Sequence, residues 1–156
     1  MTRINVIDPK LLTDQHAAAE YRELPMVNAS LKRTINSKRG LDVNKIPPRY
    51  TLNTGHVTFH YDKGLYLFNR YQSLIDELRN RGYNIQPSER SVDWSVFHYR
   101  SGLYEDWTPD QDAININVER IVERINAKPT WYRYYGKPID IKFVDKYTRG
   151  LRFAPL

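Results

Sequence analysis

The sequence contains no cysteine, so it can form neither a disulfide bond nor a thiolate-ligated metal site. It has no apolar run long enough to span a membrane, and its opening residues, MTRINVIDPK, lack the apolar centre of a signal peptide. It also has no internal repeat, no low-complexity stretch, no glycine-rich phosphate loop and no recognisable Ser/His/Asp motif. These absences favour a cytoplasmic protein and give no sign of membrane attachment.

The composition is basic and rich in aromatic residues. The chain has 156 residues, which favours a single domain with one hydrophobic core. It carries 24 Lys and Arg against 18 Asp and Glu, a formal net charge of +6, together with 12 tyrosines and three tryptophans. Cations bind phosphates and aromatic rings stack on bases, so this combination favours a nucleic-acid partner. A basic protein with a tyrosine-rich core has the same composition.

The stretch from Asp14 to Leu24, DQHAAAEYREL, has the spacing of a helix, and Asp14 is its predicted N-cap. One face is apolar, and two further faces are polar. On spacing alone this is also the pattern of an ordinary surface helix with a solvated charged face. The apolar stripe consists of Ala17, Tyr21, Leu24, Leu31 and Ile35, the second stripe of His16, Glu20 and Glu23, and the third of Gln15, Arg22 and Met26.

Hydrophobic periodicity predicts three further helical segments, at 27–37, 64–81 and 110–125, with Pro25 bending or ending the first helix. Residues 41–50 and 83–110 are predicted to be loops, whereas 51–61 locally resembles a β-hairpin. The last predicted helix carries a basic row that is either a DNA-binding surface or a solvated face paired with neighbouring glutamates. That row consists of Arg120, Arg124 and Lys128.

Two groups of residues suggest chemistry. Removal of Met1 would leave the α-amine of Thr2, whose pKa near ~8 makes it far more nucleophilic at neutral pH than a lysine, although most chain termini have no such role. His56 and His60, four residues apart and close to Asp62, suggest a metal-dependent nuclease. Two histidines without a dependable third ligand are more often structural.

Several short motifs occur in order: MTRIN, DQH, AEYRELP, GHVTF, YDK, PTWY and YYGK. Together they closely resemble the pyrimidine-dimer DNA glycosylase and AP lyase family over residues 1 to about 140. We therefore expect a glycosylase/lyase domain at 1–141. The basic-aromatic C-terminal extension at 142–156 lies outside the resemblance and receives no function from it.

The resemblance implies an all-α, compact single domain of three main helices with long ordered loops and the N-terminus threaded between the helices. It overrides the local hairpin pattern at 51–61. It also implies a metal-independent DNA repair enzyme without a cofactor, acting as a monomer in the cytoplasm of a bacterial or phage-infected cell. Its partner is double-stranded DNA containing UV photoproducts or abasic sites, from which it excises the 5′ base of a cyclobutane pyrimidine dimer and then cleaves the strand by β-elimination. Family enzymes flip out the base opposite the lesion.

The resemblance assigns roles residue by residue. Thr2 supplies the attacking amine, Glu23 is the essential carboxylate, Arg3 and Arg22 lie near the phosphates and the lesion, and His16 orients the site or handles protons. Met26 departs from the pattern, because a phage member of the family has an arginine there. The predicted DNA-binding residues are Gln15, Arg33, Arg120, Arg124, Trp131, Tyr132 and Arg133.

Three alternatives to this function remain open at the level of the sequence. The first is that the same chemistry acts on a different damaged or modified base. The second is a protein that binds damaged or single-stranded DNA without catalysis. The third is a metal-dependent DNA nuclease that uses the histidines.

Overall fold

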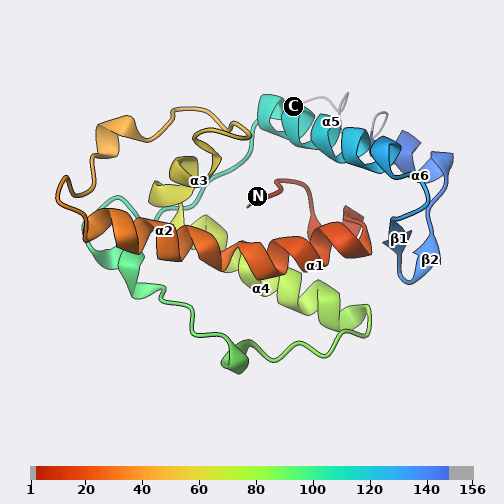
Figure 1. The fold of residues 1–156 in the computed structure, drawn as a ribbon, viewed down its shortest axis with the longest axis horizontal. Helices are drawn as coiled ribbons and strands as arrows, with labels where there is room; N and C mark the ends of the chain where they lie inside the picture. Colours follow the sequence, from red (N-terminus) through yellow and green to blue (C-terminus); the bar gives the residue numbers. More distant parts are fainter. Residues whose placement is uncertain (1–2, 148–156) are drawn as a thin grey trace.

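The computed structural model describes residues 3–147, and the chain in this range is predominantly helical (Figure 1). The long helices are α1 (Asp14–Glu23), α2 (Pro25–Ile35), α4 (Gly64–Asn80) and α5 (Gln111–Ala127). Because α1 and α2 follow one another almost without interruption, they form the first of three main helical units, which confirms the all-α prediction. The short elements are α3 (His56–Phe59), α6 (Ile141–Asp145) and the antiparallel pair β1 (Arg133–Tyr134) and β2 (Lys137–Pro138). Single turns of 3-10 helix lie at Pro9–Leu11, Val43–Lys45, His60–Asp62, Pro87–Glu89 and Ser95–His98.

The N-cap of helix α1 lies one residue earlier than the sequence predicted. Thr13, not Asp14, is the N-cap, and its hydroxyl accepts the backbone N–H of His16. Asp14 is the first helical residue, and its carboxylate reaches across to the β-hairpin. At the other end, Leu24 keeps a helical conformation and Pro25 starts α2 at the position where a missing N–H costs least.

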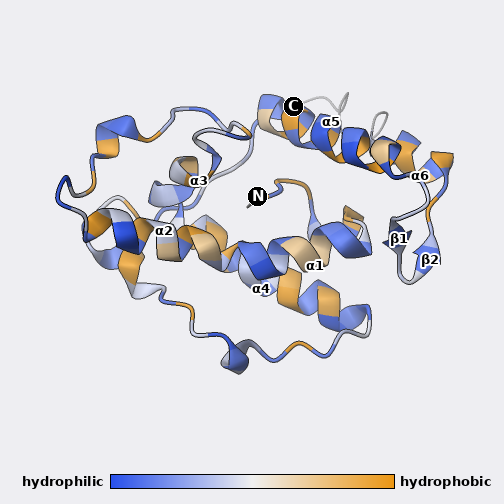
Figure 2. Ribbon diagram, in the orientation of Figure 1, coloured by the Kyte–Doolittle hydropathy of each residue, from blue (hydrophilic) through white to orange (hydrophobic). Residues whose placement is uncertain are grey.

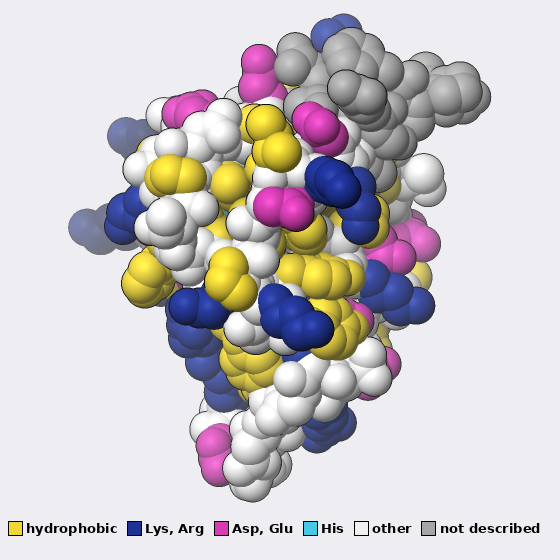
Figure 3. Space-filling view, turned by 90° about the vertical axis from the view of Figure 1, so that its right-hand side faces the viewer, with side chains coloured by type: hydrophobic (Ala, Val, Ile, Leu, Met, Phe, Trp, Pro, Cys, Tyr) yellow, Lys and Arg dark blue, Asp and Glu magenta, His cyan; other side chains and the backbone are white. Residues whose placement is uncertain are grey.

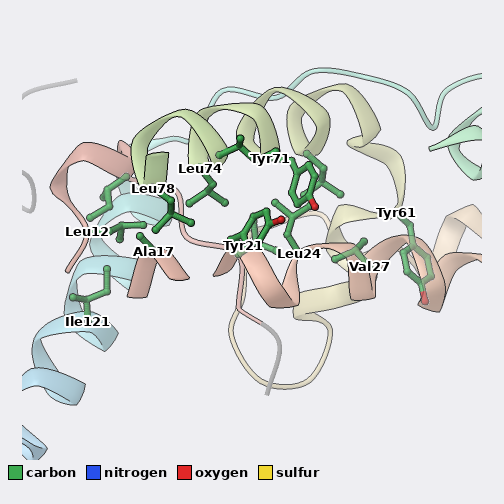
Figure 4. Close-up of a cluster of buried hydrophobic side chains, with 14 of the residues drawn as sticks. Leu12, Ala17, Tyr21, Leu24, Val27, Tyr61, Tyr71, Leu74, Leu78 and Ile121 are labelled. Atoms are coloured by element: carbon green, nitrogen blue, oxygen red, sulfur yellow. The ribbon is translucent and has the colours of Figure 1, made fainter. Parts of the chain in front are cut away.

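The core lies mainly between α1, α2 and α4. Leu12, Ala17 and Leu24 meet Leu74 and Leu78 across this interface (Figure 4), and all five are completely buried. Along each long helix, hydrophobic residues alternate with hydrophilic ones (Figure 2), in the pattern of a helix that buries one face. Burying each leucine stabilises the fold by roughly 1.5–3 kcal/mol.

The local β-hairpin pattern at 51–61 does not form a hairpin, and the helical structure implied by the resemblance is confirmed. Asn53 and Gly55 adopt left-handed φ angles of 64° and 88°, and the chain then enters α3 and a 3-10 turn that ends at Asp62. In the helical conformation His56, Phe59 and His60 are all buried. A strand would have placed the neighbours Phe59 and His60 on opposite faces. Tertiary contacts of His56 therefore outweigh a short local alternation.

The N-terminal segment, residues 3–8, threads between the helices as predicted (Figure 1). Ile4 is completely buried and the next three residues are at most 9% exposed. The predicted C-terminal extension begins with α6, and its Phe143 and Tyr147 pack against the main core, where the Tyr147 hydroxyl donates to the carbonyl of Leu11. Within residues 3–147, no helix is both long and apolar enough to cross a membrane.

Candidate active-site cleft

A cleft of about 780 Å³ opens beside α1, and most of the predicted site residues line it. Arg33 on α2 is exposed and does not line the cleft, whereas Arg120 lies beside it on α5. Thr2 lies outside the described residues. The predicted residues that the cleft brings together are Arg3, Gln15, His16, Arg22, Glu23, Arg124, Trp131, Tyr132 and Arg133.

The N-terminal segment is fixed by side chains from four helices. The backbone N–H of Ile4 donates to Nε2 of His56 at 2.7 Å, and the Ile4 carbonyl accepts the hydroxyl of Tyr50 at 2.8 Å. Further along, the N–H of Val6 donates to Oδ1 of Asn117 at 2.8 Å. A buried extended segment must satisfy its backbone groups, and here polar side chains do this in place of a neighbouring strand.

A buried ion pair also hydrogen-bonds to the N-terminal segment. Glu20 on α1 accepts from the guanidinium of Arg70 on α4, and both side chains are almost fully buried. The same guanidinium donates to the carbonyl of Ile7 at 2.8 Å, while Glu20 also accepts from the amide of Asn5 at 2.8 Å. Removing either charged partner would leave an uncompensated buried charge, which typically costs about 3–5 kcal/mol.

Glu23 is tied directly to the start of the described chain. Its Oε2 accepts the backbone N–H of Arg3 at 3.2 Å, and the carboxylate lines the cleft. Because Glu23 is the last residue of α1, its side chain is anchored on a rigid helix rather than on a loop. A carboxylate in this position can stabilise a developing positive charge or accept a proton from a bound molecule.

His16 is a buried, neutral imidazole at the wall of the cleft. Burial, followed by the positive charges of Arg3 and Arg124, lowers the pKa of His16 from 6.5 to about 4. The Thr13 hydroxyl lies 2.7 Å from Nδ1 of His16 and already accepts the backbone N–H of the same residue. In the tautomer in which this hydroxyl donates to Nδ1, the ring proton is on Nε2, which is then a hydrogen-bond donor. The ring of Tyr132 stacks on the imidazole with centroids 4.7 Å apart.

The cleft is strongly positive on its α5 side. Burial and the charges of Arg124 and Arg120 lower the pKa of Arg3, which means that the three guanidinium groups lie close enough to repel one another. Arg120 is only loosely neutralised, by Glu123 at 3.7 Å. Clustered guanidinium groups favour a bound polyanion, since phosphate oxygens accept paired hydrogen bonds and relieve the repulsion. This placement favours a DNA-binding row over the solvated face.

The segment 131–133, which follows α5, also lines the cleft, and Gln15 on α1 holds it there. The Gln15 amide donates to the Trp131 carbonyl at 2.8 Å and its carbonyl oxygen accepts the N–H of Arg133 at 2.9 Å. The Trp131 ring remains 58% exposed and is available for stacking. At the end of the molecule that carries β1, β2 and α6, Lys and Arg side chains are interspersed with hydrophobic ones (Figure 3).

A second polar network docks the β-hairpin on α1 and α4. Asp14 accepts from Arg81 at 2.9 Å and from the backbone N–H groups of Tyr135 and Gly136 at 3.0 and 2.8 Å. Glu77 accepts the hydroxyl of Tyr135 at 2.9 Å. Sequence reasoning missed this network and the roles of Asn117 and Arg70. A buried charged residue on a helix has the same sequence signature as a surface one, so the only available signal was an i, i+4 pair, Glu77 and Arg81.

The histidines proposed as metal ligands are engaged with the backbone. His56 uses Nε2 for Ile4 and Nδ1 for the Thr51 carbonyl at 2.7 Å, so it has no nitrogen left for a metal. His60 directs Nδ1 to the carbonyl of His56 at 2.8 Å. Across residues 3–147, no group of three or more potential ligands among His, Cys, Asp and Glu is arranged to hold a metal ion.

Comparison with known families adds an independent finding. A family model described as pyrimidine dimer DNA glycosylase matches residues 1–91, which is more than half of the chain. The match includes α1 and α4 and the N-terminal segment, together with Glu23 and His56. It ends before α5 and the 131–133 segment, which the fold brings to the same cleft.

Proposed function

The chain belongs to the pyrimidine dimer DNA glycosylase family, a family of DNA repair enzymes, and we propose that it excises the 5′ base of a cyclobutane pyrimidine dimer with its N-terminal amine and then cleaves the strand by β-elimination. The observation that carries this proposal is the hydrogen bond from the Arg3 N–H to Glu23 in the cleft. Three bonds join the Thr2 nitrogen to the Arg3 nitrogen, so the amine of processed Thr2 lies at most about 4 Å from that N–H. This short covalent distance supports the proposal that the amine and the Glu23 carboxylate act in one site.

The reaction begins at the sugar of the damaged nucleotide. The amine nitrogen of Thr2 forms a bond to C1′, and the glycosidic bond breaks with its electron pair on the departing base, which takes up a proton. The C1′–O4′ bond then opens to give an iminium between the protein and the sugar. The carboxylate of Glu23 is suited to stabilise the cationic character that develops at C1′.

Strand cleavage follows from the iminium. A proton leaves C2′, the electron pair moves toward the iminium nitrogen, and the C3′–oxygen bond breaks to release the phosphate. Glu23 is the proposed proton acceptor, because its carboxylate lines the cleft and accepts the N–H of Arg3, the residue that follows the proposed nucleophile. Water then hydrolyses the imine and frees the amine for another turnover.

Lesion binding is assigned to the remaining walls of the cleft. Arg3, Arg22 and Arg124 are placed to contact phosphate oxygens, and Trp131 offers an exposed ring to a base. His16 presents a neutral imidazole whose Nε2–H can donate to a sugar or phosphate oxygen without adding a charge.

The decisive experiment uses three duplexes, carrying a thymine dimer, an abasic site or no lesion, with borohydride in the reaction. We expect covalent trapping on the first two duplexes and not on the third, with no effect of a chelator. Retention of Met1, verified by mass, or acetylation of Thr2 is expected to abolish both base release and trapping, because the amine is then displaced or blocked.

Each alternative predicts a different result. Full activity with Met1 retained would refute the terminal amine as nucleophile. Loss of incision in chelator would indicate a metal-dependent nuclease, and lesion binding without incision would indicate a non-catalytic binder. Trapping on abasic DNA with an untouched dimer, and release of another damaged base, would keep the mechanism and reassign the substrate.

A further inference from the structure

The backbone N–H and carbonyl of Ile4 are each hydrogen-bonded to a buried aromatic side chain that does not line the cleft. His56 accepts the N–H at 2.7 Å, and Tyr50 donates to the carbonyl at 2.8 Å. The His56 and Tyr50 rings meet edge-on at 5.4 Å, and their exposed fractions are 2% and 5%. Ile4 is therefore the residue nearest the terminus that the described chain fixes through both of its backbone polar groups.

We propose that His56 is a positioning residue for the N-terminal nucleophile: by accepting the Ile4 N–H, it fixes how far the terminal amine reaches along the cleft toward Glu23. The inference rests on the function proposed above. It gives a role in the reaction to a histidine that the sequence suggested as a metal ligand. His56 acts through the backbone and does not touch the substrate.

The state of the imidazole suits an acceptor. Nδ1 donates to the Thr51 carbonyl at 2.7 Å, so the proton of the neutral ring is on Nδ1 and Nε2 carries a lone pair toward Ile4. Burial, together with the positive charges of Arg3 and Arg120, lowers the pKa of His56 and keeps the ring neutral near neutral pH. The loop residue Thr51 thus sets the tautomer that the N-terminal segment requires.

Distance along the chain explains why this bond matters for reactivity. Only two residues separate the Ile4 nitrogen from the Thr2 nitrogen, a span of roughly 7 Å of extended chain. A displacement of Ile4 therefore displaces the amine by a similar distance, because the intervening segment is too short to compensate for it. Displacement of a reacting group by about 1 Å commonly slows a positioned reaction by about a hundredfold.

The two amide substitutions of His56 separate the contact from the volume of the side chain. In His56→Gln the amide oxygen can occupy the place of Nε2 and accept the Ile4 N–H. In His56→Asn the shorter amide can replace only Nδ1, which contacts Thr51. His60→Gln is the matched control, because His60 lies in the same aromatic cluster and its Nδ1 bonds to the backbone carbonyl of His56 instead of to the N-terminal segment.

Single-turnover imine formation on an abasic duplex, trapped with borohydride, is the test. We expect His56→Asn to lower the maximal trapping rate about 10- to 100-fold with a binding constant within about threefold of the unsubstituted protein. His56→Gln is expected to recover most of the rate, and His60→Gln to leave it within about threefold at equal thermal stability. Hydrogen exchange at the Ile4 amide is expected to accelerate in His56→Asn alone.

Two outcomes overturn the proposal while leaving the proposed function intact. One is an equal loss of rate in all three variants, or a loss that follows thermal stability, which would make His56 an ordinary core residue. The other is a loss that appears in DNA binding rather than in the maximal rate. If the unsubstituted protein forms no adduct with abasic DNA, the proposed function itself fails, and the positioning role fails with it.

Discussion

Acidification should destabilise the folded protein through His16, and the size of the effect follows from its environment. The folded pKa of His16 is about 4, against 6.5 for an ordinary histidine, chiefly because the side chain is buried. At pH values between these two, the unfolded chain binds a proton that the folded chain does not. His16 therefore costs no unfolding free energy above about pH 6.5, and the unfolding free energy decreases as the pH falls from 6.5 toward 4.

The expected magnitude is about 3 kcal/mol. Each pH unit between the two pKa values of His16 costs about 1.4 kcal/mol of unfolding free energy, and the interval covers about two and a half pH units. Burial also lowers the pKa of His56 and of His60, so acidification destabilises the folded protein through these two residues as well. A loss of this size is a large fraction of the stability of a typical domain.

A variant isolates His16 from the other titrating groups. His16→Asn keeps a hydrogen-bonding atom near the Thr13 hydroxyl but does not titrate. Urea unfolding of both proteins at pH 7, 6, 5 and 4.5, at constant ionic strength, gives the difference in unfolding free energy at each pH. We expect the unsubstituted protein to lose about 1.4 kcal/mol per pH unit more than the variant below pH 6.5. Parallel curves would show that the folded pKa of His16 is not lowered.

Three further substitutions test the chemistry, the binding surface and the substrate. Glu23→Gln should bind dimer-containing DNA nearly normally while base release in single turnover falls at least a hundredfold, because the shape remains and the charge is lost; equal losses of binding and rate would contradict this. Arg120→Ala and Arg124→Ala should each flatten the plot of log binding constant against log salt by about 0.9 per lost phosphate contact, and unchanged slopes would return the row to a solvated surface. Met26 on α2 is 53% exposed, so the fold is expected to tolerate Met26→Arg. The variant should release dimer bases about 10- to 100-fold faster, since one charge-assisted contact is worth about 1.5–3 kcal/mol. Abasic-site cleavage by the same two proteins shows whether the gain is specific to the dimer.

The helices and their apolar faces could be predicted from the sequence because periodicity reports directly on burial. The helix predicted at 64–81 corresponds to α4, and its apolar residues Leu67, Tyr71, Leu74 and Leu78, which recur at helical spacing, are all at most 3% exposed. The end of α4 also has a local cause, since Gly82 adopts a left-handed φ of 94° that other residues rarely take. These features depend on nearest neighbours in the chain.

The polar part of the site could not be predicted in the same way. Glu20 was placed on a polar stripe beside His16 and Glu23, yet it is 1% exposed because Arg70, fifty residues away, neutralises it. Gln15 was expected to contact DNA, and in the fold both ends of its amide hold the main chain of 131–133. Such residues are recognised only when their distant partner is known, because local spacing is the same for a solvated side chain and for a buried, paired one.

The cleft combines two parts of the chain that have different tasks. The N-terminal segment, Glu23 and His56 lie within the residues that match the family, and hydrogen bonds fix the backbone of Arg3 and Ile4 to Glu23 and His56. Arg124 and the segment 131–133 lie beyond that match and supply the positive and aromatic walls. The bonds of Gln15 to residues 131 and 133 join these parts across α1. Loosening that connection should therefore change DNA binding more than the reaction of the bound sugar, because the hydrogen bonds from Arg3 to Glu23 and from Ile4 to His56 do not involve Gln15.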